Sequence, residues 1–391
     1  MELLDTGEPI RLLAPDGRLT GAAQPPDGTS PAGPSPAGAW PADLAQPPAP
    51  DPAQVRDLYR WMRLTRRLDT EAFALQRHGE LGLWAPSLGQ EAAQVGSITA
   101  LRASDYVFPS YREHAAALVR GVTPEQMMAQ WRGTSGCGWD PTALHLHPYT
   151  VVLAAQLPHA TGYAMGIQRD GADEVVLTYF GDGASSQGDA NEAFNWAAAC
   201  SAPVIFFCQN NQYAISTPTT LQMRAPLHRR ARGFGLDSYL VDGNDVLAVR
   251  ALTERVAEQV RSGAGPALIE AVTYRMGAHT SSDDPKRYRD QAETDAWKEK
   301  DPIVRVERLL HAQGWWSDTD AAALDAECER FGQDLRAACR SFGPVALDAL
   351  FDTVLAAPTA LLTRQRAEFA GFLEEMHQLE DDATTPEGVS R

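Results

Sequence analysis

Two polar segments with the residue types of a phosphate and metal site stand near the middle of the chain. The segment GDGA (181–184) directly follows the apolar run VVLTYF, and Asn211 ends the apolar run PVIFFCQNN. The glycines allow a sharp turn and a close approach of the backbone to a ligand. The helix expected after the turn would direct its free N–H groups at a phosphate. Asp182 and Asn211 would add a carboxylate and an amide oxygen, which are ligands that Mg²⁺ prefers.

Each half of this pattern also has an ordinary structural explanation. Asp-Gly is common in turns, and Asn-Asn is common in loops. A binding site is favoured because both halves stand at the ends of apolar strands that one helix connects.

Strands and helices alternate in this part of the chain. Strands are expected at 175–180, 203–211, 238–243 and 267–275, and a helix at 245–262 lies between the last two. This alternation is typical of an α/β fold with a mostly parallel sheet and helices on both faces. Ligands bind such sheets at the carboxyl ends of the strands, which is where both polar segments lie.

Three parts are expected along the chain. Residues 1–50 are rich in Pro, Ala and Gly, and we interpret them as a disordered arm, because they bury too little apolar surface to offset the entropy of ordering. Asp51 and Pro52 are typical of a helix start, so an α/β domain with a helical C-terminal part is expected over 51–372. An acidic mobile tail is expected over 373–391.

Composition excludes several classes of protein. The net charge is −17 and no long Lys/Arg run occurs, which argues against a nucleic-acid-binding protein. No apolar run reaches the ~20 residues of a membrane span, and no basic-then-apolar signal segment begins the chain. The five cysteines are scattered without metal-binding spacing, which predicts reduced thiols in a cytoplasmic protein.

The spacing of GDG and NN resembles the thiamine-diphosphate motif of the transketolase-like family. The wider stretch 181–218 resembles the alpha subunit of 2-oxo acid dehydrogenases, so a thiamine-diphosphate-binding fold is expected. The resemblance implies three ligands for Mg²⁺ and three further cofactor contacts. The metal ligands are Asp182, Asn211 and the carbonyl of Tyr213, and the further contacts are Gly183, Ala184 and Ile215.

Segments before this motif also match the family in order. FPSYREH (108–114) resembles the family's YRE segment, which implies that Tyr111 and Arg112 bind diphosphate oxygens, a task suited to the planar guanidinium. The match over 79–101 implies that Leu83 and Trp84 line the substrate side-chain pocket, and Tyr111 is assigned to that pocket as well.

The segment 136–156 departs from the family pattern. It is shorter than usual, and the hydroxyl side chains that hold a structural potassium ion in the family are partly lost. Val151 and Leu153 still offer backbone contacts to the aminopyrimidine ring, and Leu153 is bulky enough to support the bent shape of the cofactor.

His279 follows an apolar strand and opens the polar loop HTSSDD. At a strand's carboxyl end, an imidazole could hydrogen-bond a diphosphate oxygen or a developing oxyanion. A lone histidine there is often only a structural loop residue. The resemblance implies a catalytic role, because the family's histidine supports acyl transfer to the lipoyl group.

The resemblance implies oxidative decarboxylation of a 2-oxo acid in a two-alpha, two-beta assembly. A beta subunit would supply the glutamate that activates the cofactor, and a lipoyl-bearing acyltransferase would accept the acyl group. The segments NNQYAISTP, VDGND and QGWWSD resemble the branched-chain members of the family, which implies substrates of the 2-oxoisovalerate type. Two alternatives stay open. One is a pyruvate or acetoin enzyme, and the other is a non-catalytic scaffold subunit.

Overall fold

The computed structural model describes residues 7–20, 40–42, 44–353 and 355–384. The chain divides into two compact units, Met1–Arg340 and Ser341–Arg391, which are described separately. The first unit holds every residue of the candidate site.

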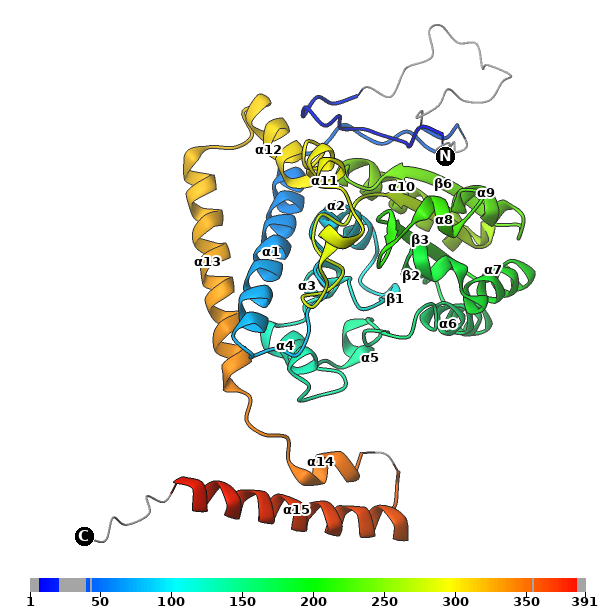
Figure 1. Cartoon of the computed structure of the whole chain (residues 1–391). Coiled ribbons are helices and arrows are strands. Elements are labelled where there is room, and N and C mark those ends of the chain that lie inside the picture. Colours follow the sequence, from blue (N-terminus) through cyan, green and yellow to red (C-terminus); the bar gives the residue numbers. More distant parts are fainter. Residues whose placement is uncertain (1–6, 21–39, 43, 354, 385–391) are drawn as a thin grey trace, which may run out of the picture. The chain divides into compact units, whose positions relative to one another are not determined.

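A five-stranded parallel sheet forms the centre of the first unit (Figure 1). Its strand order is β1-β2-β3-β7-β6, and all four pairings are parallel. The strands are β1 (Tyr106–Phe108), β2 (Val176–Gly181), β3 (Val204–Asn210), β6 (Asp237–Asp242) and β7 (Ala267–Val272). Every residue of β3 is buried, as expected of a central strand covered on both faces. The predicted α/β fold and its four predicted strands are confirmed.

Helices, short turns and a two-stranded hairpin complete the described residues from 44 to 341. The hairpin consists of β4 (Tyr213–Ala214) and β5 (Thr217–Pro218), and the short turns are η1 (Asp182–Ser186), η2 (Val260–Ala264) and η3 (Pro285–Arg287). The helices are α1 (Pro52–Arg77), α2 (Glu91–Thr99), α3 (His114–Val119), α4 (Pro124–Arg132), α5 (Pro141–Leu144), α6 (Gln156–Asp170), α7 (Gly188–Cys200), α8 (Thr219–Gln222), α9 (Leu227–Arg232), α10 (Val246–Gln259), α11 (Gln291–Lys298), α12 (Pro302–Ala312) and α13 (Asp318–Ser341).

The two faces of the sheet are covered by different helices. Right-handed crossovers place α7, between β2 and β3, and α10, between β6 and β7, on opposite faces, because the two connections run in opposite directions along the sheet. On the α7 face, Phe194 packs with Phe180 and Phe206 in an apolar core that α6 and α9 complete. On the other side, α2 packs against α10, and a second core forms among α1, α2, α10 and α12.

Helix α1 begins where the sequence predicts. The side chain of Asp51 accepts a hydrogen bond from the backbone N–H of Gln54, and Pro52 occupies the first helical turn. Helix α13 runs along α1 (Figure 1), and ion pairs such as Arg336–Glu71 connect the two helices.

The predicted disordered arm is wrong for residues 7–20. Ile10 forms a parallel bridge with Val241 of β6 and exchanges backbone hydrogen bonds with Leu240 and Asp242. Leu13 is fully buried in the second core. A few apolar residues within a Pro- and Gly-rich segment therefore suffice to order it, because the edge of β6 supplies free hydrogen-bonding groups. Residues 21–39 of the predicted arm lie outside the described residues.

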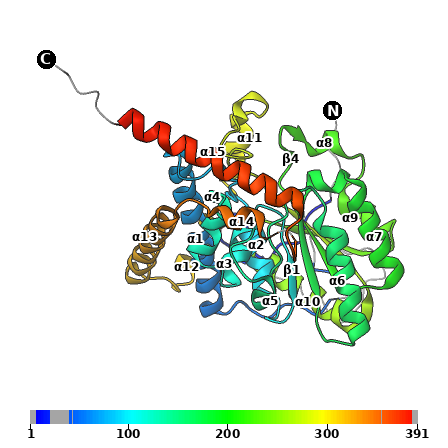
Figure 2. The same cartoon turned by 90° about the horizontal axis from the view of Figure 1, so that it is seen from below.

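The second unit consists of α14 (Leu347–Phe351) and α15 (Ala360–Thr384), both seen in Figure 2. The predicted tail boundary at residue 373 is wrong, because α15 continues to Thr384. Phe369, Phe372 and Met376 recur at helical spacing through that boundary, which accounts for the continuation. Residues 385–391 lie outside the described residues. Across the described part of the chain, no helix has the length and apolar character that a membrane crossing requires.

Candidate active site

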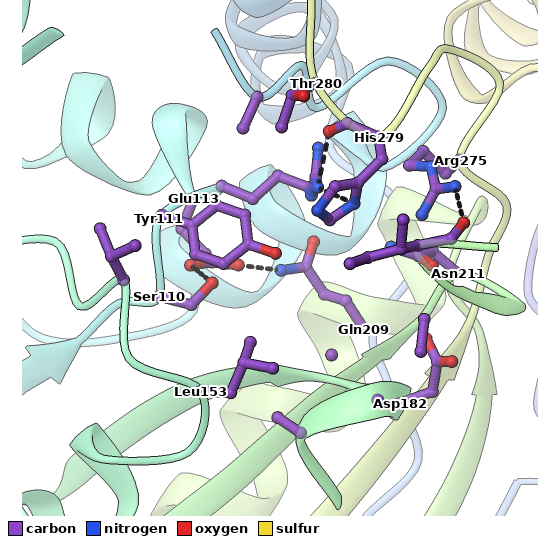
Figure 3. Close-up of a pocket in the computed structure, with 18 of the residues that line it drawn as sticks. Ser110, Tyr111, Glu113, Leu153, Asp182, Gln209, Asn211, Arg275, His279 and Thr280 are labelled. Atoms are coloured by element: carbon purple, nitrogen blue, oxygen red, sulfur yellow. Dashed lines mark hydrogen bonds between the residues drawn. The ribbon is translucent and has the colours of Figure 1, made fainter. Parts of the chain in front are cut away.

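A cavity of about 440 Å³ lies at the carboxyl ends of the sheet strands (Figure 3). The segments that follow β1, β2, β3 and β7 all contribute to its wall. Its volume is within the range of small-molecule sites. The predicted site residues that line it are Leu83, Tyr111, Arg112, Val151, Leu153, Asp182, Gly183, Ala184, Asn211, Tyr213, Ile215 and His279.

Asp182 and Asn211 approach the cavity from neighbouring strands β2 and β3. Asp182 is buried, and desolvation raises the pKa of its carboxyl group above the ordinary value. The amide nitrogen of Asn211 donates to Oε1 of Gln90 at 3.1 Å, so the amide oxygen is directed away from Gln90. The carbonyl of Tyr213 also lies at the cavity, where it accepts a hydrogen bond from Arg275 at 3.0 Å.

These donor atoms fit a hard divalent cation. A carboxylate, an amide oxygen and a backbone carbonyl are ligands typical of Mg²⁺, which dehydrates reluctantly and shares its site with phosphate oxygens. Among the described residues, no group of three or more His, Cys, Asp or Glu side chains is placed to hold a metal. The chemistry therefore matches Mg²⁺ with a phosphate ligand better than a zinc site.

The GDG turn is tightly packed on one side. A Cβ atom at Gly183 would lie 2.7 Å from Cβ of Ala214, so this position requires glycine. At Gly181, by contrast, an added Cβ would meet no protein atom within 4 Å.

The expectation that a helix opens at this turn needs correction. The turn is a five-residue 3₁₀ segment, η1, and α7 begins only at Gly188 after an extended residue, Gln187. The aligned dipoles of a long helix therefore do not begin at Asp182.

Two buried arginines place guanidinium groups at the cavity wall. Arg112 donates to the carbonyls of Pro86 and His279, and Arg275 donates to the carbonyls of Tyr213 and Ile215. Among the described residues, the hydrogen-bond partners of the two guanidinium groups are carbonyls, the His279 ring and the Tyr288 hydroxyl, and none is a carboxylate. Burial lowers the pKa of Arg275. A buried guanidinium without an ion-pair partner favours a bound anion, and a diphosphate would be such an anion.

His279 is held as a neutral imidazole. Burial, followed by the charges of Arg112 and Arg275, lowers its pKa to about 3. Nη2 of Arg112 lies 3.2 Å from Nδ1 of His279. Because a guanidinium can only donate, Nδ1 must accept, and the ring proton resides on Nε2. The loop is fixed further by Asp283, whose carboxylate accepts from the His279 backbone N–H and from the Tyr288 hydroxyl.

Sequence reasoning missed several residues of the wall. Glu113 is buried, and its carboxylate accepts from the Ser110 hydroxyl at 2.7 Å and from Gln209 at 2.5 Å (Figure 3). Burial raises the pKa of Glu113. In the sequence, only their positions beside predicted site residues pointed to them, because Glu113 follows Tyr111-Arg112 and Gln209 precedes the Asn-Asn pair. Gln90 and Arg275 carried no signal that distinguished them from ordinary polar residues.

A sequence profile of the dehydrogenase E1 component family matches residues 59–334, which include this whole cavity. The chain belongs to the dehydrogenase E1 component family. The 3-methyl-2-oxobutanoate dehydrogenase subunit alpha of Mycobacterium tuberculosis (strain CDC 1551 / Oshkosh) is 42% identical over 367 residues, which cover 94% of each chain. The pyruvate dehydrogenase E1 component subunit alpha of Staphylococcus aureus (strain Mu50 / ATCC 700699) is 39% identical over 289 residues, 73% of this chain and 77% of that relative. The resemblance read from the motifs is thus confirmed.

One predicted pocket residue of this E1-family chain does not line the cavity. Trp84 is fully buried, and its indole N–H donates to Asp69 at 2.9 Å while its ring stacks on His114. Its neighbour Leu83 does line the cavity and is 39% exposed. Successive residues of an extended segment point in opposite directions, so only one of the pair faces the cavity.

Several apolar side chains of the cavity wall are more exposed than is usual for apolar residues. Val151, Leu153 and Ile215 line the cavity and are 66%, 46% and 53% exposed. Ile215 also has a φ of 54°, a left-handed conformation that a β-branched residue rarely adopts. Strained backbone and exposed apolar groups are both common at ligand sites. Their occurrence together at this cavity therefore supports a ligand site.

Proposed function

We propose that this chain is the alpha subunit of the decarboxylating component of a branched-chain 2-oxo acid dehydrogenase complex. It would bind thiamine diphosphate and Mg²⁺, act on 2-oxo acids of the 2-oxoisovalerate type, and pass the acyl group to a lipoyl arm. The observation that carries the proposal is the meeting of Asp182, Asn211 and the Tyr213 carbonyl with Arg112 and His279 at one cavity.

The residues of the wall fit this cofactor. Asp182, Asn211 and the carbonyl of Tyr213 would hold Mg²⁺, and Arg112 with Tyr111 would bind the diphosphate. When bound, thiamine diphosphate supplies an electron sink for the loss of carbon dioxide. Gly183 and Ala184 would lie along the diphosphate.

The apolar residues of the wall would hold the organic part of the cofactor. Leu153 would support its bent shape, with Val151 and Ile215 beside it. Binding would cover these three exposed side chains and explain their exposure.

His279 has the protonation state that the proposed reaction requires of it. With its pKa lowered to about 3, the ring stays neutral at neutral pH. Its Nε2–H can then donate a hydrogen bond to a diphosphate oxygen or to a developing oxyanion. Arg112 fixes both the tautomer and the orientation of the ring.

The carboxylate that activates the cofactor would come from a beta subunit. The acidic residues that line the cavity are Asp182 and Glu113. Asp182 is assigned to the metal, and both oxygens of Glu113 already accept hydrogen bonds from Ser110 and Gln209. A second chain would therefore complete the site, in a two-alpha, two-beta assembly, and a lipoyl-bearing acyltransferase would follow it in the complex.

The similarity to the relative from Mycobacterium tuberculosis supports branched-chain substrates, because that relative is named for 3-methyl-2-oxobutanoate. A pyruvate enzyme is the second candidate, because the relative from Staphylococcus aureus is named for pyruvate. One or two methylene groups change the binding free energy by only about 1–3 kcal/mol, so a few pocket residues decide between the two substrates.

The cysteines of the chain are unpaired, which supports our proposal of a cytoplasmic location.

Two measurements on the chain reconstituted with its beta subunit test these proposals. Calorimetry should detect thiamine diphosphate binding that depends on Mg²⁺, and a complex that gives no metal-dependent heat would be a scaffold. We expect kcat/KM to be higher for 2-oxoisovalerate than for pyruvate. The opposite ranking would assign the chain to the pyruvate enzymes.

A further inference from the structure

Asp182 is connected to a second part of the proposed metal site by one side chain, Gln222. The amide nitrogen of Gln222 donates to Oδ2 of Asp182 at 2.7 Å. The same nitrogen donates to the backbone carbonyl of Thr217 at 2.9 Å. Both hydrogens of the amide are therefore used, which fixes the position of the amide group between its two partners.

The Thr217 carbonyl belongs to the hairpin that carries a proposed metal ligand. Strand β5, which contains Thr217, pairs with strand β4, which contains Tyr213. Gln222 thus joins the Asp182 carboxylate to the hairpin that presents the Tyr213 carbonyl. Asp182 follows β2, and Tyr213 follows β3. The hydrogen bond from Gln222 to Oδ2 of Asp182 is shorter than the one from the Thr219 hydroxyl, at 3.4 Å, so the Gln222 amide is the closer of the two side-chain donors that hold this oxygen.

The amide oxygen of Gln222 is unfavourable for chain stability. This oxygen is buried and has no hydrogen-bond partner in the described residues. A buried acceptor without a partner is unfavourable, and an apolar side chain of similar size would remove that penalty. The donated hydrogen bonds are what an apolar replacement would lose.

We propose that Gln222 is a positioning residue for the divalent cation, holding Asp182 and the Tyr213 hairpin at the separation that the ion requires. The inference rests on the proposed function, because it assumes that Asp182 and Tyr213 bind the ion. Outer partners of metal ligands orient the ligands, and their loss weakens metal binding by about 10–100-fold. Gln222 does not line the cavity, so it would act through Asp182 without touching the substrate.

The test measures Mn²⁺ binding to the full-length chain with its beta subunit and saturating thiamine diphosphate, using the electron paramagnetic resonance signal of free Mn²⁺. Gln222→Met should raise the Kd for Mn²⁺ by about tenfold or more. Gln222→Asn keeps the amide but draws it back by one methylene, and it should also weaken binding. Gln187→Met is the control, because Gln187 is exposed and close in sequence to the same turn.

A second readout separates positioning from a direct catalytic role. At saturating Mn²⁺, kcat of the Gln222 variants should return to the wild-type value. An unchanged Kd in both variants would overturn the inference, and so would a kcat that stays low when metal is saturating. If the wild-type complex shows no Mn²⁺ binding that depends on thiamine diphosphate, the proposed function itself fails, whatever the variants do.

Discussion

Asp182 combines burial with a negative charge. Burial raises its pKa, while the amide of Gln222 and the charge of Arg275 lower it. A carboxylate in such a position is unfavourable unless a cation compensates it. A bound divalent ion would be the largest local charge and would keep the group ionised, so the burial of Asp182 is better explained by a metal ligand than by a turn residue.

Replacing this carboxylate should therefore remove metal binding. Asp182→Asn keeps the shape of the side chain but removes its charge, and we expect the Kd for Mg²⁺ to rise by more than about 100-fold, beyond the loss typical of outer partners. Calorimetry on the reconstituted complex with thiamine diphosphate measures this. Asp173→Asn, at an exposed ion pair with Arg102, is the control. Equal Mg²⁺ affinity in Asp182→Asn and wild type would contradict the metal assignment.

His279 should make the folded chain less stable in acid. Its pKa falls from 6.5 unfolded to about 3 in the folded chain, so the unfolded state binds more protons between these values. Stability is then full above about pH 6.5 and declines as the pH falls toward 3. The slope stays below about 1.4 kcal/mol per pH unit, because the ring is partly exposed and screened.

The variant His279→Asn isolates this contribution. Urea unfolding at pH 7, 6 and 5 should show a smaller loss of stability in the variant than in the wild type. The comparison cancels other titrating groups, such as Asp69, whose pKa burial raises to about 7. Parallel stability curves would mean that His279 is not held neutral.

The GDG turn packs directly against the β4–β5 hairpin at Gly183. Gly183→Ala would place its Cβ 2.7 Å from Cβ of Ala214, and overpacking of this kind costs about 1–3 kcal/mol. Because the clash displaces one metal-site segment from another, we expect weaker thiamine diphosphate binding as well as a lower Tm. The double variant Gly183→Ala/Ala214→Gly removes the opposing Cβ and should recover most of both losses. Failure of the rescue would show that glycine is needed for another reason.

The N-terminal segment should contribute to stability rather than act as a free arm. Leu13 is fully buried, and its backbone N–H donates to Asp245 at 2.6 Å. Leu13→Ala should lower the free energy of unfolding by about 2–5 kcal/mol, as for other buried leucines. Urea denaturation of the full chain measures this, with Leu19→Ala, which is more exposed, as the comparison. A loss below about 0.5 kcal/mol would mean that the segment detaches before the domain unfolds.

For the molecule as a whole, the sequence predicted what depends on local pattern and missed what depends on long-range contacts. The strands, the start of α1 and the meeting of Asp182 with Asn211 at one cavity followed from apolar runs and the polar residues at their ends. The ordered structure of residues 7–20 could not be predicted in this way, because Ile10 and Leu13 gain partners only when β6 and α12 are in place. The inward rotation of Trp84 and the contacts of Gln90 and Gln222 likewise depend on neighbours distant in sequence.

The last prediction concerns the chain without a partner. Within the described part of the chain, the cavity offers no uncommitted carboxylate, because Asp182 faces the proposed metal and Glu113 accepts from Ser110 and Gln209. The full-length chain with thiamine diphosphate and Mg²⁺ should therefore release no carbon dioxide from 2-oxoisovalerate, and addition of the beta subunit should start turnover. The variant Glu113→Gln sharpens the test. If the isolated wild-type chain turned over substrate and this variant did not, Glu113 would be the activating carboxylate. That result would exclude a site shared between two chains.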